Sequence, residues 1–334
     1  MEKNLRSGTD SAGPHRLRWG VLGCGGVAGK FVRDLNAAGM RVEAAASRDG
    51  ARALGFAAAN GIPRSHAGYQ PLLDDKDVDA IYVALPNHMH AEWSIRAARA
   101  GKHVLCEKPA ALSEADCESV VRAVERAGVF FMEGFMYRCH PQWGLARALL
   151  EEGAIGELRG LRADFSYDLG ERPGNVRLSR EAGGGALTDV GCYGLSFARW
   201  FAGEPVRLRA TATLGPEGVD VAAEARLEFQ DGVRAEITCG LRAARPHVAV
   251  IEGDNGRIEI AKPWHPPPQG AEVKVITAEG ESVYSAGDGL GLFAREALEV
   301  AENLGRKQGP SMSWEDSLGQ ARALEALRKA AGLG

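Results

Sequence analysis

The sequence Gly23-Cys24-Gly25-Gly26-Val27-Ala28 indicates the type of fold, because an apolar segment precedes it and a helical pattern follows it. Residues 17–22 read as a strand, and residues 27–38 read as a helix that Gly39 ends. The stretch matches the pattern G-x-G-x-x-G/A, in which the first glycine permits a tight turn and the second admits a pyrophosphate close to the backbone. A glycine-rich turn that binds no ligand can have a similar local sequence. The position of this turn between a strand and a helix favours the dinucleotide-binding turn. We predict that the pyrophosphate of a dinucleotide is bound here by Gly23, Gly25, Gly26, Val27 and Ala28.

The rest of the first part of the chain repeats this alternation of strand and helix. Further strands are predicted at residues 41–46, 79–85, 102–106 and 129–132, with helices at residues 51–59, 90–100 and 113–127. The strand at residues 79–85 is apolar almost throughout, which is typical of a parallel sheet covered on both faces. The pattern predicts an α/β Rossmann domain, a doubly wound parallel sheet, over residues 17–133.

The pattern changes after residue 133, where strands follow one another with few helices between them. Helices are predicted at residues 141–152, 186–201, 292–304 and 314–331. Strands are predicted at residues 158–167, 206–214, 222–229, 233–238, 247–252, 257–260 and 272–277. We therefore expect an α+β domain at residues 134–334, built on an open, mostly antiparallel β-sheet with closing helices. The polar residues 1–16 are predicted to be a disordered tail.

Composition excludes several classes of protein. The chain has 334 residues and a formal net charge of −4, which gives no reason to expect a nucleic-acid partner. No apolar stretch approaches the ~20 residues of a membrane span, so no membrane partner is predicted. Six cysteines without a CxxC pair argue against a metal site or a disulfide framework and favour a cytoplasmic location.

Residues at the end of the second predicted strand indicate whether the cofactor is NAD or NADP. An acidic residue there would bind the ribose 2′-hydroxyl of NAD. This chain has Ser47-Arg48, a hydroxyl and a guanidinium that suit the 2′-phosphate of NADP. Asp49 leaves NAD open as an alternative, since it is either the acidic residue that binds the 2′-hydroxyl or the N-cap of the next helix. We predict NADP (NADPH) rather than NAD.

Two loops follow strands at the sheet edge where such folds bind ligands. The first is Leu85-Pro86-Asn87-His88-Met89-His90. If it did not face a cofactor, it would be an ordinary helix start with Asn87 as its cap. We interpret it as a turn that faces the cofactor through Leu85, Pro86, Asn87 and His90. The second is Glu107-Lys108-Pro109. If it had no function, it would be a solvated surface turn. We expect Glu107 to face the cofactor, and Lys108 to lie beside both the cofactor and the reacting atoms of the substrate.

The second part of the chain contains the motif Gly183-Gly184-Gly185-Ala186-Leu187-Thr188-Asp189-Val190-Gly191-Cys192-Tyr193. Three glycines allow the backbone to approach another group closely. Asp189 and Tyr193 are four residues apart, which places them on one face of a helix. A helix start with a half-buried tyrosine would explain the same residues without a function.

Taken together and in this order, the three motifs make the chain resemble the glucose–fructose oxidoreductase / inositol dehydrogenase family, Gfo/Idh/MocA, from residue 17 onward. Many members have histidine where this chain has Tyr193. Tyrosine there is similar to the branch with glucose–fructose oxidoreductase, dimeric dihydrodiol dehydrogenase, NADP-dependent D-xylose dehydrogenase and sugar 3-ketoreductases. The resemblance implies that Lys108 and Tyr193 are the catalytic pair. It also implies a homodimer or homotetramer assembled through the exposed face of the antiparallel sheet.

The function expected from these features is that of an NADP-dependent oxidoreductase. Hydride would pass between nicotinamide and a secondary alcohol or ketone carbon of a sugar, nucleotide-sugar or cyclic polyol. We expect Tyr193 to move the proton, with its pKa lowered by the Lys108 ammonium, and Asp189 to hold the substrate or orient Lys108. Two alternatives are an NAD-dependent glycosidase that oxidises its substrate transiently, and a regulator that senses the dinucleotide without catalysis.

Overall fold

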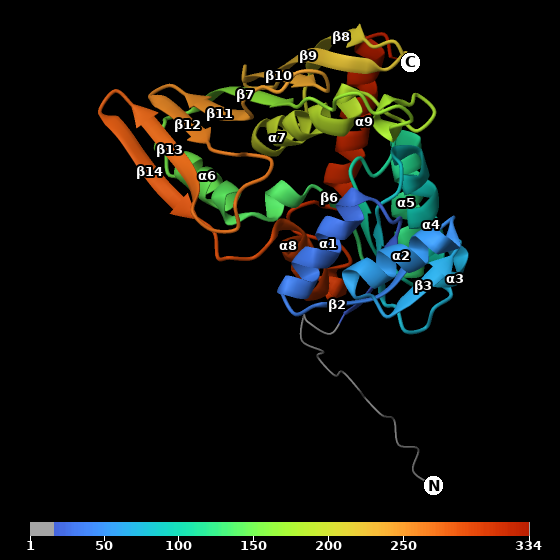
Figure 1. Cartoon of the computed structure of the whole chain (residues 1–334). Coiled ribbons are helices and arrows are strands. Elements are labelled where there is room, and N and C mark those ends of the chain that lie inside the picture. Colours follow the sequence, from blue (N-terminus) through green and yellow to red (C-terminus); the bar gives the residue numbers. More distant parts are fainter. Residues whose placement is uncertain (1–16, 334) are drawn as a thin grey trace.

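The computed structural model describes residues 17–333, so the tail predicted at residues 1–16 lies outside the described part of the chain. Its strands form two sheets, with the first half of the chain around one and the second half around the other (Figure 1). Within residues 17–333, no helix is both long enough and apolar enough to cross a membrane. The same residues contain no group of three or more histidine, cysteine, aspartate or glutamate side chains placed to hold a metal ion.

The first sheet is entirely parallel and has the strand order β3-β2-β1-β4-β5-β6. Its strands are β1 (Arg18–Leu22), β2 (Arg41–Ser47), β3 (Arg64–Ala67), β4 (Ala80–Val83), β5 (His103–Glu107) and β6 (Phe131–Gly134). The helices between them are α1 (Gly26–Ala37), α2 (Gly50–Asn60), α3 (Gln70–Leu73), α4 (His90–Arg99) and α5 (Glu114–Ala127). The strand order reverses between β1 and β4, and this switch point is where doubly wound sheets bind ligands. The predicted Rossmann sheet is confirmed.

The second sheet has the strand order β14-β13-β12-β11-β7-β10-β9-β8. Its strands are β7 (Leu158–Ser166), β8 (Arg207–Leu214), β9 (Asp220–Glu228), β10 (Arg234–Gly240), β11 (Val248–Gly253), β12 (Gly256–Ile260), β13 (Ala271–Thr277) and β14 (Gly280–Ala286). Only β7 and β10 pair in parallel, so the prediction of a mostly antiparallel sheet is confirmed. The helices α6 (Pro141–Glu151) and α7 (Cys192–Ala202) pack on one side of this sheet (Figure 1).

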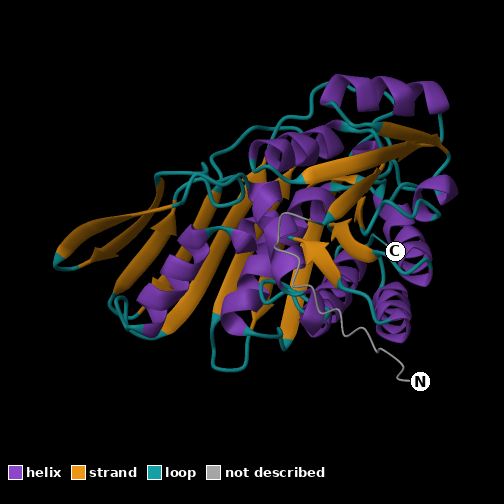
Figure 2. Cartoon of the chain, turned by 90° about the horizontal axis from the view of Figure 1, so that it is seen from below, coloured by secondary structure: helices purple, strands orange, loops and turns teal. Residues whose placement is uncertain are grey.

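The last two helices connect the halves of the molecule. Helix α8 (Leu292–Glu302) packs against α1, and α9 (Trp314–Ala330) packs against α5 as well as α7 and β8. Figure 1 shows α9 running from beside β6 up to β8. The hairpin of β13 and β14 projects at the left-hand end of both views (Figures 1 and 2). The domain boundary at residues 133 and 134 stays a prediction.

Two edge strands and the short helix α3 were not predicted because their sequences lack an apolar pattern. Strand β3 lies at an edge of the parallel sheet, and its four side chains are all at least partly exposed. Helix α3 follows it and has only four residues. Strand β14 lies at an edge of the second sheet, and none of its side chains is buried. Edge strands need no continuous apolar face, so their sequences carry little periodic signal.

Candidate active site

A cleft of about 1080 Å³ lies at the switch point of the parallel sheet and continues toward the second sheet. It is lined from one side by the glycine turn after β1 and by the loops after β2, β4 and β5. The opposite side is lined by residues of β7, of the following loop and of the segment that begins α7. All three motifs singled out in the sequence therefore meet in one cavity.

The glycine turn has the form that a bound pyrophosphate requires. Gly23 has a φ of +99°, and a Cβ atom there would overlap the carbonyl oxygen of Ala84. By contrast, a Cβ added at Gly25 or Gly26 would meet nothing within 4 Å, so open space lies over this turn. Gly25 caps α1 without a side-chain hydrogen bond, which leaves the N–H groups of the first turn available to an anion. The residues fit a dinucleotide, with Val27 lining the cleft and Ala28 buried in the core.

The end of β2 separates the roles of Ser47, Arg48 and Asp49. Asp49 Oδ1 accepts the N–H groups of Ala51 at 2.9 Å and Arg52 at 3.3 Å, so this side chain is the N-cap of α2. Ser47 is 7% exposed, and both Ser47 and Arg48 line the cleft. Arg52 also lines it and donates to the carbonyl oxygen of Cys24 through Nε at 3.3 Å and Nη2 at 3.1 Å. Sequence analysis missed Arg52, which adds a second guanidinium where a 2′-phosphate would lie.

The loop after β4 is fixed from two directions. Leu85, Pro86, Asn87 and His90 all line the cleft. Asn87 Nδ2 donates to the carbonyl oxygen of Gly183 at 2.9 Å, which joins this loop to the glycine-rich motif. His90 is 1% exposed, and its Nδ1 and Nε2 each lie 2.7 Å from a carbonyl oxygen, those of Pro109 and Leu85. Burial lowers the pKa of His90 to about 4. His90 therefore links the two loops that carry Leu85 and Lys108.

Lys108, Asp189 and Tyr193 come together as predicted. Lys108 Nζ donates to the backbone carbonyl oxygen of Asp189 at 2.6 Å and lies 3.6 Å from its Oδ1. The same Nζ lies 5.0 Å from the centroid of the Tyr193 ring, over its face. The side chains of Lys108 and Asp189 are each 12% exposed, so this ion pair is largely shielded from water. Asp189 thus contacts Lys108 directly, which is the geometry that the predicted role of orienting Lys108 requires.

The ion pair determines the charge of both partners. Burial lowers the pKa of Lys108, but Asp189, Cys192 and Glu107 outweigh burial and hold that pKa above its ordinary value. Burial raises the pKa of Asp189, but Lys108 and Arg177 outweigh it and hold that pKa below its ordinary value. At neutral pH the site therefore holds an ammonium beside a carboxylate.

The expectation of a lowered pKa for Tyr193 is wrong. Burial, followed by Glu107, Cys192 and Asp189, raises the pKa of this phenol well above its ordinary value. The Lys108 ammonium, 5.0 Å from the ring centroid and paired with Asp189, does not reverse this shift. Tyr193 is consequently a neutral hydroxyl group, which is the form that can donate a proton.

The helix that carries these residues begins irregularly. A regular helix was expected from residue 186, but Leu187–Gly191 is a π-helical turn and α7 starts at Cys192. Asp189 lies in the wide turn and Tyr193 in the first turn of α7, so their spacing is not that of one α-helical face. Asp220 on β9 accepts the N–H of Leu187 at 2.6 Å and fixes the start of the turn. Such π-turns are common at functional sites.

The triple glycine serves close packing of the protein itself. A Cβ at Gly184 would overlap the carbonyl oxygen of Arg177, and one at Gly185 would overlap the carboxylate of Asp220. Gly183 and Gly185 also have positive φ angles, +73° and +115°. The glycines allow the loop of Arg177 to lie directly beside Asp189.

Sequence analysis missed two partners of Asp189. Tyr167 Oη donates to Asp189 Oδ2 at 2.7 Å, and Arg177 Nε donates to the same oxygen at 3.0 Å. Glu107, predicted on the cofactor side, accepts from Tyr82 Oη and from the backbone N–H of Lys108 at 3.3 Å. Burial raises the pKa of Glu107. The contacts of Asp189 with Tyr167 and Arg177, and that of Glu107 with Tyr82, join residues from different elements, so no local spacing could reveal them.

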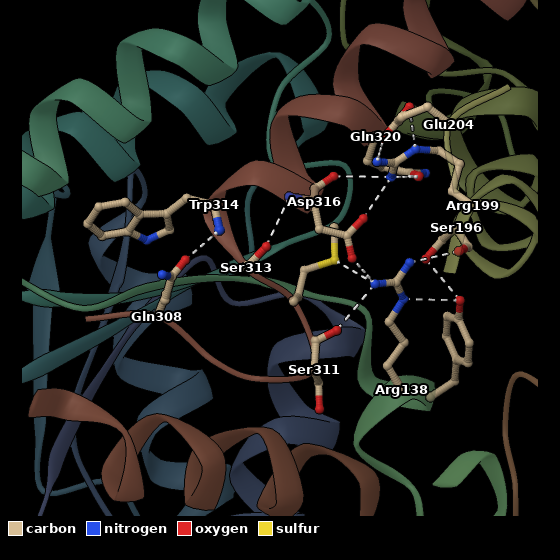
Figure 3. A network of polar contacts seen from close by, with 12 residues as sticks. Arg138, Ser196, Arg199, Glu204, Gln308, Ser311, Ser313, Trp314, Asp316 and Gln320 are labelled. Carbon is tan, nitrogen blue, oxygen red and sulfur yellow. Dashed lines mark hydrogen bonds and ion pairs between the residues drawn. The ribbon is translucent and has the colours of Figure 1, made fainter. Parts of the chain in front are cut away.

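A buried network holds the helix of Tyr193 in place (Figure 3). Arg138 donates to the carbonyl oxygen of Ser196 at 2.7 Å and forms an ion pair with Asp316. Arg199 Nη1 lies 2.9 Å from the other oxygen of Asp316. Gln320 Nε2 donates to the carbonyl oxygen of Cys192, next to Tyr193, at 2.9 Å. The network therefore fixes α7 to α9 and to the segment that leads out of the parallel sheet.

Comparison with known proteins gives matches over nearly the whole chain. A model described as an oxidoreductase family with an NAD-binding Rossmann fold matches residues 17–135. A model described as the GFO/IDH/MocA C-terminal domain matches residues 143–259. D-xylose 1-dehydrogenase (NADP(+)) 2 of Haloferax volcanii is 33% identical over 320 residues, which cover 95% of this chain and 98% of that protein.

Two further similarities involve Actinomadura kijaniata. Its dTDP-3,4-didehydro-2,6-dideoxy-alpha-D-glucose 3-reductase is 34% identical over 326 residues, 96% of this chain and 97% of that protein. The crystal structure of KijD10, a 3-ketoreductase from that organism in complex with NADP and TDP-benzene, matches with a TM-score of 0.87. The sequence identity there is 33%, and the match covers 94% of this chain and 97% of that one. The family predicted from the motifs is confirmed, and the chain belongs to the GFO/IDH/MocA oxidoreductases.

Proposed function

We propose that this protein is an NADP-dependent oxidoreductase that interconverts a secondary alcohol and a ketone on a sugar, nucleotide-sugar or cyclic polyol. One observation carries the proposal: Lys108 Nζ bridges Asp189 and the ring of Tyr193 inside the cleft that the glycine turn lines. An ammonium and a neutral phenol beside a dinucleotide site are the groups that carbonyl reduction requires.

Each residue has a distinct task in this scheme. Nicotinamide, when bound, supplies or accepts the hydride. Tyr193 donates the proton to the carbonyl oxygen during reduction, and its raised pKa keeps that proton available at neutral pH. Lys108 remains cationic and stabilises the negative charge that develops on the same oxygen. Asp189 fixes the position of the Lys108 ammonium.

The choice of NADP rests on the charges around the loop after β2. Arg48 and Arg52 both line the cleft there, and Asp49 is occupied as a helix cap. Two guanidinium groups favour a 2′-phosphate, and the carboxylate that would favour a free 2′-hydroxyl is engaged elsewhere. Two of the similar proteins support this choice, because the xylose dehydrogenase is described as NADP-dependent and KijD10 was crystallised with NADP.

The test is a screen of sugars, nucleotide-ketosugars and cyclic ketones against NADPH, with the reverse reaction followed from NADP⁺. We expect stoichiometric loss of NADPH absorbance with a ketosugar and no net reaction with simple glycosides. Release of sugar from a glycoside without net change in NADPH would instead identify a glycosidase. NADPH binding without turnover on any substrate would identify a sensor.

We further propose that the protein is a homodimer or homotetramer. Helices α6 and α7 cover one side of the second sheet, and within residues 17–333 no helix covers the other side (Figure 1). A second copy packed on that side would remove its surface from water. We also propose a cytoplasmic location, which the six free cysteines support.

A further inference from the structure

The loop between β7 and the π-helical turn places two arginines at the substrate side of the cleft. Arg172 and Arg177 both line the cavity and are exposed. Val176, which is 44% exposed, lies between them in sequence and also lines the cavity. The loop thus presents two positive charges and an apolar side chain to a bound molecule.

Within residues 17–333, the positive charges on this side of the cleft outnumber the carboxylates that pair with them. Arg177 pairs with Asp189 through Nε at 3.0 Å, but Asp189 also balances Lys108. Within residues 17–333, Arg172 forms no ion pair with a carboxylate. By comparison, the nearby Arg242 pairs with Glu217 at 3.2 Å, and Arg245 pairs with Asp164 at 3.3 Å. Arg172 therefore brings an uncompensated positive charge to this side of the cleft, and Arg177 shares its carboxylate with Lys108.

The whole cleft is basic although the chain is acidic. Seven basic and three acidic side chains line it, while the formal net charge of the chain is −4. Four of the basic residues, Lys30, Arg33, Arg48 and Arg52, come from α1 and from the segment after β2, where the phosphates of a dinucleotide would lie. Arg172 and Arg177 come from the opposite side and cannot be assigned to the same phosphates.

The two histidines on that side leave this positive charge unchanged. His247 and His265 line the cleft near Phe165. Burial lowers the pKa of both and brings that of His265 to about 4, so at neutral pH they are uncharged. The positive potential on the substrate side comes from Arg172, Arg177 and Lys108.

We propose that Arg172 and Arg177 bind an anionic group of the substrate, a phosphoryl group or a carboxylate. The proposal rests on the proposed function and narrows its substrate to a charged sugar derivative, in preference to a neutral free sugar. Guanidinium groups bind both anions through paired, charge-assisted hydrogen bonds. Because Arg177 and Lys108 share Asp189, the anion would bind next to the catalytic lysine and set which carbon faces Tyr193.

Calorimetry on the protein saturated with NADPH tests this subsite, because the bound cofactor keeps nucleotides out of its own site. The probes are UDP for a phosphoryl group, D-glucuronate for a carboxylate, and D-glucose as the neutral control. The variants are Arg172→Met, Arg177→Met and the double variant. Arg122→Met is the matched control, since Arg122 is an exposed arginine on α5 that does not line the cleft.

We expect UDP or D-glucuronate to bind at least tenfold more tightly than D-glucose, and the one that binds identifies the source of the anion. Each single substitution should weaken that probe about tenfold, as the loss of one charge-assisted contact does. The control variant and the affinity for NADPH should change less than twofold. Raised salt should weaken the probe in the wild type and hardly at all in the double variant.

Three results would overturn the subsite. They are equal affinity for all three probes, unchanged anion binding in the folded double variant, and lost turnover with intact anion binding in Arg177→Met. The last would show that Arg177 acts only by orienting Asp189. Arg177→Lys, which keeps the charge, serves as a second variant if Arg177→Met does not fold. Failure of the anion subsite and failure of the proposed function can be told apart. The first would appear in the calorimetry, and the second would appear only in the activity screen as a lack of NADPH turnover.

Discussion

Replacement of Arg48 by alanine tests the assignment of the cofactor. Arg48 lies at the carboxyl end of β2, lines the cleft and is exposed, so its removal leaves no buried cavity. One charge-assisted contact with the 2′-phosphate is worth ~1.5–3 kcal/mol, which corresponds to a loss of about tenfold to a hundredfold in NADPH affinity. NADH lacks that phosphate, so its dissociation constant should change by less than about twofold. Fluorescence titration of both reduced cofactors measures the two constants directly.

Two matched variants sharpen this experiment. Arg52→Ala should weaken NADPH more than NADH, because its guanidinium lies at the same end of the cleft, and should weaken both to a smaller extent because it also removes the hydrogen bonds to the Cys24 carbonyl in the glycine turn. Asp49→Ala removes the N-cap of α2 and should cost ~1 kcal/mol of stability without a gain in NADPH preference. Equal losses of affinity for NADPH and NADH in Arg48→Ala would show that Arg48 does not bind the 2′-phosphate. So would a switch in cofactor preference caused by Asp49→Ala alone.

Three further predictions concern stability and assembly. Asp316→Ala leaves the fully buried side chain of Arg138 without its counter-ion and should lower the free energy of unfolding by ~3 kcal/mol, whereas an unchanged urea midpoint would contradict the role of the network. Burial raises the pKa of Glu133 to about 7, above its unfolded value, so its contribution to stability is present at low pH and is lost as the pH rises through 7. The free energy of unfolding of Glu133→Gln should therefore rise relative to that of the wild type by about 2.5 kcal/mol between pH 5 and pH 8, and parallel stability–pH curves would argue against a neutral Glu133. Light scattering at micromolar concentration should give a multiple of the 35.5 kDa chain mass, and the mass of a single chain would refute the homo-oligomer.

The sequence predicted the parts of the molecule whose signals are local. The glycine turn, Lys108 and the strands around them are read from neighbouring residues, because a parallel sheet brings the ends of its strands to one edge. Edge strands β3 and β14 have no alternation of apolar and polar residues, so they were not predicted from the sequence. The same limit applies to the site, where the partners of Asp189 come from separate elements.

Burial explains why the charge state of Tyr193 was predicted wrongly. The sequence indicated that Lys108 lies close to Tyr193, and the structure places its Nζ 5.0 Å from the ring centroid. It could not indicate that the phenol is 4% exposed or that Asp189 balances the ammonium. Proximity can follow from motifs, whereas a pKa depends on every charge and on the water around the group.

The rate of hydride transfer in Tyr193→Phe shows whether Tyr193 donates the proton. The substitution removes the hydroxyl and keeps the ring that packs against Phe135, Phe165 and Trp264. Stopped-flow absorbance of NADPH, on a substrate for which hydride transfer limits turnover, should show a rate ~10²–10⁴-fold below the wild type. The affinity for NADPH should be nearly unchanged, and Lys108→Met should impair the same step at least comparably, with losses that do not add. A Tyr193→Phe enzyme within about threefold of the wild-type rate, with only a lowered melting temperature, would contradict the account and leave Tyr193 a packing residue.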